Sequence, residues 1–314
     1  MIGAGPVGSA IALELVGRGF EVHQISAQWP GEGITGDYAA GIGCVFKPSS
    51  AAVGAWVLDS YARWMAQARD MNCPAVQLTR VSAVVPSGSI DPVWKDRVED
   101  FRRDSDTRLS YLTYSFDPVQ LGQWRTASFV AGGGVTVRRP LTPTEVSHLR
   151  QRRTIEGFSH TVVTMGLNLR AVFPELMLYP IRGVLVHFRD GLDGDNSFID
   201  ENAVSYAVTR PNGCVIGGTF DEYVETCSVD EQQSLGEQLV IDANRRFGLT
   251  LDFTQRTRIT VGYRPGCAVA PGMDVGDEVS IVNGLGGQGW VTGHALATDI
   301  ADRIQKRLPS ASAR

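Results

Sequence analysis

Three glycines near the beginning of the sequence have the spacing of a phosphate-binding turn. Gly3, Gly5 and Gly8 form the pattern G-x-G-x-x-G, and the helix-forming run 9–16 follows at once. Glycines at these positions allow a tight turn and a close approach of the backbone to a pyrophosphate, which the N–H groups at the helix start then bind. The pattern predicts a dinucleotide site, although such glycines also occur in ordinary turns.

The elements around this turn fit a βαβ unit only in part. Residues 20–25 have the pattern of the return strand, but only Met1 and Ile2 precede Gly3, whereas a central strand needs about five residues. We therefore expect either that residues are missing upstream or that another segment fills the central position. Ser26 stands where an acidic residue would normally bind the ribose 2′-hydroxyl, and its hydroxyl binds a ribose more weakly than a carboxylate does.

The composition limits the size class, the partners and the location of the protein. The chain has 314 residues and 43% hydrophobic content, enough for two domains that each have a core. Its net charge of −5 and its lack of Lys/Arg-rich runs argue against nucleic acid as a partner. The sequence has neither a run of about 18 apolar residues nor a secretion signal, so we expect a cytoplasmic protein with no membrane contact.

The cysteines and histidines give no sign of a metal site or a disulfide framework. Five cysteines are scattered along the chain without a C-x-x-C pair, and five histidines form no ligand pair at helical spacing. We therefore predict no metal, and we expect each histidine to be an ordinary core or surface residue.

A second unusual stretch covers residues 35–43, where nearly all side chains are small. Small side chains are needed where a flat ring system lies against the backbone, although an ordinary surface loop explains the run equally well. Ser49 or Ser50 is expected to cap an amphipathic helix that continues to Arg69. A strand at 76–81 and a loop over 90–102 follow.

The remaining patterns predict alternating helices and strands. An Asn212-Gly213 pair favours a hairpin turn, and Ser228 with Glu231 forms a capping-box pattern. The expected helices are 118–130, 229–247 and 290–307, and the expected strands are 135–137, 161–166, 183–188, 204–209, 214–220, 258–263 and 279–283. A glycine-rich turn at 284–289 joins the last strand to the last helix, and such a turn offers N–H groups and a positive dipole end to an acceptor.

Several of these segments together resemble the D-amino-acid oxidase and D-aspartate oxidase family. The run 35–41 is similar to the family's flavin-contacting Thr-x-Asp-x-Ala-Ala-Gly, and 91–102 is similar to its Asp-Pro-x-Trp-Lys-Asp stretch. Residues 161–166 match the family's hydrophobic strand that ends in glycine, and 180–184 match its Pro-x-Arg-Gly-Gln except for a valine in place of glutamine. The turn 284–289 corresponds to the segment that faces the flavin ring in that family. The resemblance covers nearly the whole chain in order.

The resemblance implies an α/β fold with a Rossmann-like FAD-binding domain and a second, α+β substrate domain built on a mixed antiparallel sheet. We expect the FAD-binding domain to comprise residues 1–72, 115–175 and 258–314, and the substrate domain residues 73–114 and 176–257.

The resemblance also implies that FAD binds through residues from separate segments. These are Gly3, Gly5, Pro6, Val7, Gly8, Ser26, Thr35, Asp37, Ala39, Ala40, Gly41, Ile42, Gly43, Leu141, Thr164, Gly166, Arg264, Gly286, Gly287, Gln288, Gly289 and Trp290. No cysteine lies near Gly286 in the sequence, so we expect FAD to be held non-covalently.

Three residues are expected to face the substrate. Residues 262–265 are similar to the family's Gly-Phe-Arg-Pro, which implies that Arg264 binds the substrate carboxylate, because a guanidinium fork matches a carboxylate. Tyr206 corresponds to a tyrosine that helps to hold the same carboxylate. Asn202 stands where the vertebrate enzymes have a tyrosine in a mobile lid, and the segment 188–202 is shorter than that lid. We therefore expect a more open pocket and an altered substrate preference.

The expected reaction is the oxidation of an amino acid by hydride transfer from the α-carbon to flavin. Its products are an imino acid, which hydrolyses to a 2-oxo acid and ammonia, and hydrogen peroxide from O₂. A glycine- or sarcosine-oxidase-like enzyme and a degenerate flavin-binding protein remain as alternatives. The resemblance also implies that the chain can form a homodimer.

Overall fold

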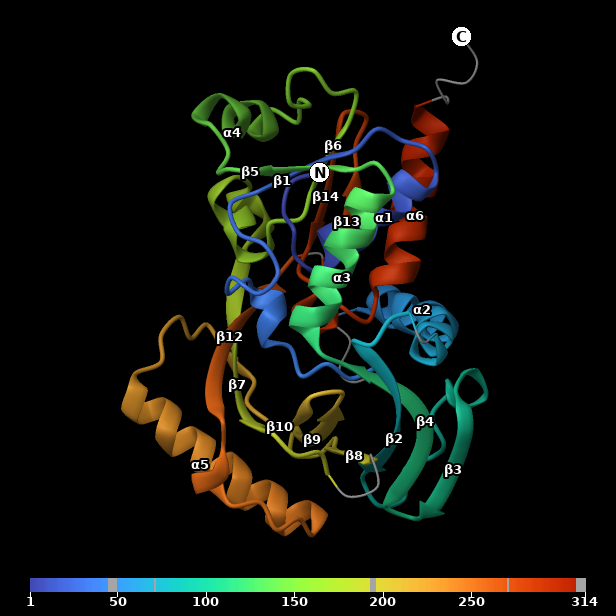
Figure 1. Cartoon of the computed structure of the whole chain (residues 1–314), viewed down its shortest axis with the longest axis vertical. Helices are drawn as coiled ribbons and strands as arrows, with labels where there is room; N and C mark the ends of the chain where they lie inside the picture. The colour runs from blue at the N-terminus through green and yellow to red at the C-terminus, as the bar shows by residue number, and fades with distance from the viewer. Residues whose placement is uncertain (45–49, 71, 193–195, 270, 309–314) are drawn as a thin grey trace.

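The structure is a computed structural model that describes residues 1–44, 50–70, 72–192, 196–269 and 271–308. Figure 1 shows two parts, of which the upper one contains the N-terminus, a small sheet and the helices α1, α3 and α6. The lower part is a large curved sheet with α5 on its outer side. None of the helices in the described part of the chain combines the length and the apolar surface that a membrane span needs.

The central strand position of the small sheet, for which the sequence offers only Met1 and Ile2, is occupied by Ile2. Ile2 forms parallel bridges to Ile25 and Val163, and its backbone donates to Val162 (2.8 Å) and accepts from Thr164 (2.9 Å). The start of the chain itself therefore joins the strands on either side of it. In spatial order these strands are β5 (Val135–Arg138), β1 (His23–Ser26), the Ile2 bridge, β6 (Thr161–Val163), β14 (Val279–Asn283) and β13 (Gly272–Val275).

Three helices cover this sheet and form one core with it. They are α1 (Pro6–Gly17), α3 (Pro118–Ala131) and α6 (Gly293–Arg307). Ile11 of α1 and Leu296 and Ile300 of α6 are fully buried in this core. Burial of each such side chain stabilises the fold by roughly 2 kcal/mol.

The local signals for helix ends are confirmed in most cases. The Ser50 hydroxyl accepts from the Val53 N–H (3.2 Å) and begins α2 (Ala51–Arg69). Ser228 caps α5 (Val229–Phe247) in the same way, but the Glu231 carboxylate binds Arg182 (2.5 Å), so the reciprocal half of the predicted capping box is replaced by an ion pair. The helix α4 (Pro143–Arg150) was not predicted.

The large sheet has nine strands in the described part of the chain and forms the lower part of the molecule in Figure 1. The order β11–β7–β10–β9–β8–β2–β4–β3 runs along it, and β12 pairs with the other side of β7. The bounds are β2 (Val76–Val84), β3 (Glu99–Ser105), β4 (Arg108–Phe116), β7 (Leu178–Phe188), β8 (Asn196–Asp200), β9 (Ser205–Arg210), β10 (Gly213–Gly217), β11 (Asp221–Glu222) and β12 (Arg258–Cys267). The predicted α/β fold with a second mixed sheet is confirmed, whereas the domain boundaries stay a prediction.

One sequence expectation in this sheet was wrong. The predicted loop over 90–102 ends in strand β3 on a sheet edge, and five of the seven residues of this strand are Arg, Asp or Glu. Charged side chains protect an edge strand from pairing with other chains, and they hide the apolar alternation that identifies a strand.

Candidate functional site

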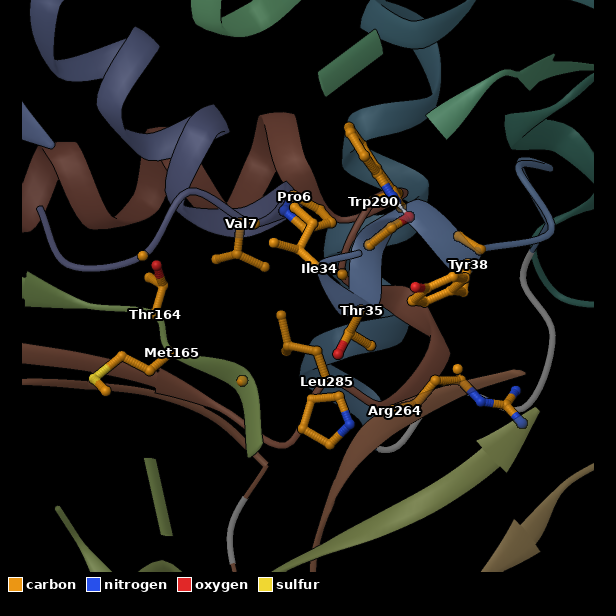
Figure 2. A pocket seen from close by; sticks show the side chains of 18 of the residues that line it. Pro6, Val7, Ile34, Thr35, Tyr38, Thr164, Met165, Arg264, Leu285 and Trp290 are labelled. Carbon is orange, nitrogen blue, oxygen red and sulfur yellow. Dashed lines mark hydrogen bonds between the residues drawn. The ribbon is translucent and has the colours of Figure 1, made fainter. Parts of the chain in front are cut away.

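A cavity of about 840 Å³ lies where the small sheet meets the large one. It is lined by the turn after Ile2, the end of β1, parts of the run 33–44, the end of β6, the turn 284–291 and several residues of the large sheet. Figure 2 shows Thr164 and Met165 on one side of this space and Tyr38 and Arg264 on the other, with Pro6, Val7 and Trp290 above.

Each glycine of the first turn has a different structural role. Gly3 has φ +98°, and a Cβ there would lie 2.6 Å from the Thr164 carbonyl oxygen. A Cβ on Gly8 would overlap the Gly3 carbonyl, so Gly8 permits packing of helix on turn and does not itself line the cavity. A Cβ on Gly5 meets nothing within 4 Å and would enter the cavity. No side chain caps the first turn of α1, which leaves its N–H groups for a ligand.

Within the small-residue run 35–43, some residues line the cavity and others support the loop from behind. Asp37 does not line the cavity, because its carboxylate accepts from the N–H groups of Gly31 (3.0 Å), Gly33 (2.9 Å) and Ile34 (3.1 Å) and so fixes the loop. Burial raises the pKa of Asp37. Gly43 packs on the Tyr114 ring and also does not line the cavity.

All other predicted cofactor residues line the cavity. They are Gly3, Gly5, Pro6, Val7, Ser26, Thr35, Ala39, Ala40, Gly41, Ile42, Leu141, Thr164, Gly166, Arg264, Gly286, Gly287, Gln288, Gly289 and Trp290. Residues separated by more than 280 positions in the sequence thus face one space.

The turn after β14 is tied to the small-residue run. The Trp290 indole N–H donates to the Gly36 carbonyl (2.9 Å), and Gly286 has φ +53° with open space where a Cβ would be. The cavity therefore borders the small-residue run 35–43 and the turn 284–289, and at Gly286 no side chain separates the cavity from the backbone.

No acidic residue lines the cavity at the end of β1 in the described part of the chain. The Ser26 hydroxyl donates to the Gln28 carbonyl (2.6 Å), which leaves its oxygen as an acceptor. Arg139 lies beside it but is paired with Glu145 at 2.7 Å, and this pairing lowers the pKa of Glu145 to about 2.

Arg264 occupies the opposite end of the cavity on β12. Its Nη2 donates to the carbonyls of Thr219 (2.8 Å) and Arg182 (3.1 Å), and its Nε donates to Ile181 (3.4 Å). The ring of Phe220 lies 5.0 Å from the guanidinium carbon. Asp221 pairs with Arg182 instead (2.9 Å), so the described part of the chain provides Arg264 with no ion pair. Burial lowers its pKa.

Tyr206 lies next to this arginine. It is paired with Gly217 across β9 and β10, and its ring covers the place where a Gly217 side chain would be. Burial raises the pKa of the Tyr206 hydroxyl, and the nearby positive charge of Arg264 acts in the opposite direction. Both residues line the cavity, so the structure brings together the two side chains predicted to hold a carboxylate.

Asn202 does not join them. It lies in the turn between β8 and β9, where its backbone N–H donates to the Asp200 carboxylate (3.0 Å), and it is not among the lining residues. Val204 lines the cavity from this turn instead. Part of the short segment 188–202 falls outside the described residues, so the expectation of a more open pocket stays a prediction.

A comparison with family profiles decides the assignment of the chain. The profile described as FAD dependent oxidoreductase matches residues 109–303. The chain belongs to this family. FAD is therefore its cofactor, as predicted.

Solved structures support the same fold for this FAD-dependent oxidoreductase. Iminodiacetate oxidase from Chelativorans sp. BNC1 is 17% identical with a TM-score of 0.68, over 98% of this chain and 95% of that one. Glycine oxidase from Geobacillus kaustophilus is 15% identical with a TM-score of 0.73, over 98% and 94%. L-alpha-glycerophosphate oxidase from Mycoplasma pneumoniae, solved with FAD bound, is 11% identical with a TM-score of 0.72, over 97% and 93%. A search of curated proteins gives no match.

The cavity of this FAD-dependent oxidoreductase fits the cofactor of its family. The uncapped start of α1 faces the same space as the open positions at Gly5 and Gly286. Donor groups at a helix N-terminus suit a diphosphate, and side-chain-free backbone suits a flat ring. A volume of about 840 Å³ lies within the range of small-molecule and cofactor sites.

Phe220 and Gly183 shape the surroundings of Arg264, a role that the sequence predicted for neither residue. Phe220 lies two positions after the glycine pair 217–218 and lacks any periodic signal, yet its ring lies against Arg264. A Cβ on Gly183 would lie 3.1 Å from Arg264 Nη2 and 3.3 Å from its Cζ. Gly183 thus leaves the space that the guanidinium needs.

Replacing Gly183 by Ala is expected to raise KM for the substrate about tenfold, because displacing the guanidinium costs on the order of 1–2 kcal/mol. The melting temperature should change little, since the crowded atoms belong to a flexible side chain. Steady-state kinetics and thermal melting measure the two effects. An unchanged KM would show that the position of Arg264 does not depend on this glycine.

Proposed function

We propose that the chain is an amino-acid oxidase of the D-amino-acid oxidase type, acting on the C–N bond of a substrate that has one carboxylate. The observation that carries this proposal is Arg264. Its guanidinium is positioned by three backbone carbonyls rather than by an acidic side chain, and it borders the cavity that fits FAD.

The hydrogen bonds of Arg264 leave a donor group for a substrate. Nε and Nη2 are bonded to protein carbonyls, whereas Nη1 lies 3.8 Å from the place of a Cβ on Gly287. Gly287 belongs to the turn expected to face the flavin ring. A carboxylate on Nη1 would therefore place the rest of a small substrate beside that ring.

The remaining residues orient the substrate and exclude water. Tyr206 supplies a hydroxyl near the carboxylate, while Ile42, Leu185 and Ile199 form an apolar wall. Removal of water strengthens the pairing of Arg264 with a carboxylate. Bound FAD supplies the acceptor for the hydride that leaves the α-carbon. The neutral amine loses one proton as the hydride leaves, which yields the imino acid. O₂ takes up the two electrons and two protons and becomes hydrogen peroxide.

The charges that line the cavity favour a neutral amino acid over a dicarboxylate. Among the described residues, two further arginines line the cavity. Arg139 lies beside Ser26 and is already paired with Glu145, and Arg150 belongs to α4 in the upper part of the molecule (Figure 1) and donates to the Ala171 carbonyl (2.8 Å). Arg264 is then the cation that the described lining offers beside the apolar wall. A second carboxylate would be buried without a partner there, at a cost of several kcal/mol.

A glycine- or sarcosine-oxidase-like activity is the second candidate. It is supported by the likeness to solved glycine oxidases over 98% of this chain. The two candidates use the same site and differ in the group on the α-carbon or nitrogen.

An anaerobic titration tests the function. The purified yellow protein is expected to lose its absorbance near 450 nm when its amino-acid substrate is added without O₂, and to release hydrogen peroxide when air is admitted. The panel comprises D-Ala, D-Phe, D-Asp, glycine, sarcosine and L-Ala. Bleaching by D-Ala or D-Phe but not D-Asp supports the first candidate and contradicts the expectation of an altered substrate preference. Bleaching only by glycine and sarcosine supports the second candidate. A protein that binds FAD but is bleached by none of them would contradict both.

The non-covalent binding of FAD is proposed together with this function. Acid precipitation is expected to release all yellow colour into the supernatant. Colour that remains in the pellet would overturn this part of the proposal.

A further inference from the structure

Arg125 of α3 is a buried arginine whose charge the fold leaves unbalanced. The residue is 2% exposed, and its guanidinium carbon lies 5.0 Å from the Trp64 ring and 5.1 Å from the Trp290 ring. Arg182, which is similarly buried, is paired with Asp221 and Glu231. The ion pairs among the described residues include no carboxylate on Arg125.

The hydrogen bonds of Arg125 also leave it partly unsatisfied. Nη1 donates to the Pro6 carbonyl (3.2 Å), but Nη2 is buried without a hydrogen-bond partner in the described part of the chain. Leaving such a charged donor unpaired costs free energy. Burial accordingly lowers the pKa of Arg125 to about 10, still well above neutrality.

The guanidinium of Arg125 lies beside the N-terminal ends of the two helices α1 and α6. Pro6 is the first residue of α1, and Gly293, whose Cβ position lies 3.4 Å from Nη2, is the first residue of α6. The N-terminal end of each helix carries partial positive charge. Pro6 and Trp290, which both contact Arg125, line the cavity. Three positive groups therefore meet behind one wall of the cavity, and a ligand is the available source of negative charge.

We infer that Arg125 is a positioning residue for FAD and that the diphosphate of the bound cofactor balances its buried charge. This inference rests on FAD binding by the family and not on the proposed substrate. Arg125 acts on the diphosphate through space and through the Pro6 carbonyl, which it holds at the start of α1. The protein without FAD carries the cost of the buried cation, and FAD binding relieves it.

The inference predicts effects of opposite sign in the two forms of the protein. Arg125→Met keeps a long unbranched side chain between the two indole rings and removes the charge. We expect the flavin-free variant to melt at or above the temperature of the flavin-free wild type. We also expect its dissociation constant for FAD to rise about thirtyfold, so that added FAD raises its melting temperature by less than in the wild type. Thermal melting with and without FAD and a titration of flavin fluorescence measure these quantities.

Two further variants separate charge from packing. Arg125→Lys retains the charge, and its dissociation constant for FAD should stay within about threefold of wild type. Arg182→Met is the matched control, because it removes a buried arginine that does have carboxylate partners and should lower the melting temperature with and without FAD alike. A flavin-free Arg125→Met that melts below wild type or fails to fold would overturn the inference. So would unchanged FAD affinity in that variant, or a loss of affinity in Arg125→Lys as large as in Arg125→Met.

Discussion

Replacing Arg264 by Met is expected to lower kcat/KM about a thousandfold, which corresponds to about 4 kcal/mol. The substrate carboxylate would lose its counter-charge in a cavity where burial has already removed water, and three backbone carbonyls that Arg264 now satisfies would lose their donor. The loss should appear mainly in KM, and carboxylates such as propionate should cease to perturb the flavin spectrum. Steady-state kinetics and difference spectroscopy with propionate measure the two effects.

Arg264→Lys distinguishes charge from geometry at the same position. A lysine retains the charge but lacks the planar fork, so its kcat/KM should fall between those of wild type and Arg264→Met. If Arg264→Met oxidised the substrate at the wild-type rate and still bound propionate, Arg264 would not be the carboxylate anchor.

Replacing Gly5 by Ala is expected to weaken FAD binding about a hundredfold without unfolding the protein. Gly5 has φ −69° and ψ −178°, a conformation that alanine adopts readily, and the added Cβ meets no protein atom within 4 Å. The methyl group would instead occupy the space where the diphosphate approaches the start of α1, and overpacking of this kind costs about 1–3 kcal/mol. Flavin fluorescence and melting of the flavin-free protein measure the outcome.

Gly17→Ala is the matched control for this prediction. Gly17 ends the same helix, is exposed, and has no atom within 4 Å of its Cβ position. Alanine there should stabilise the protein by about 0.5–1 kcal/mol and leave FAD affinity unchanged. Equal FAD affinity in Gly5→Ala and Gly17→Ala would show that Gly5 does not face the cofactor.

The features predicted best from the sequence are those fixed by local backbone chemistry. A glycine turn before a helix, a serine cap at Ser50 and a hairpin turn near Gly213 need specific residues at specific positions, and the structure has all three, although Gly213 (φ +114°) begins β10 and the two turn residues are Pro211 and Asn212. The separate roles of the glycines within the first turn could not be predicted from the sequence. Gly8 serves packing and Gly5 faces the cavity, a division that depends on which atoms oppose each glycine.

The parts that were missed depend on contacts between distant segments. Arg125 and Trp64 are 61 positions apart, and no periodicity marks a guanidinium that will lie between two indoles. Asn202 was predicted from its distance to Tyr206 along the chain, but the turn between β8 and β9 directs its backbone to Asp200. The length of the first strand did not predict whether it joins the sheet, because the place of Ile2 in the sheet depends on its bridges to β1 and β6.

The pairing of β12 with β7 restricts how this site can change over evolution. The ladder continues through ten residue pairs, and Arg264 is one of them, opposite Ile181. A slip of one residue would turn Arg264 to the other face of the sheet, so the anchor can move only in steps of two residues, roughly 7 Å. Such a step is longer than a small amino acid tolerates between its carboxylate and its reacting carbon. On the proposed function, we therefore expect new substrates to be accommodated by exchanging wall residues such as Ile199 and Val204, while the distance from Arg264 to the cofactor stays constant.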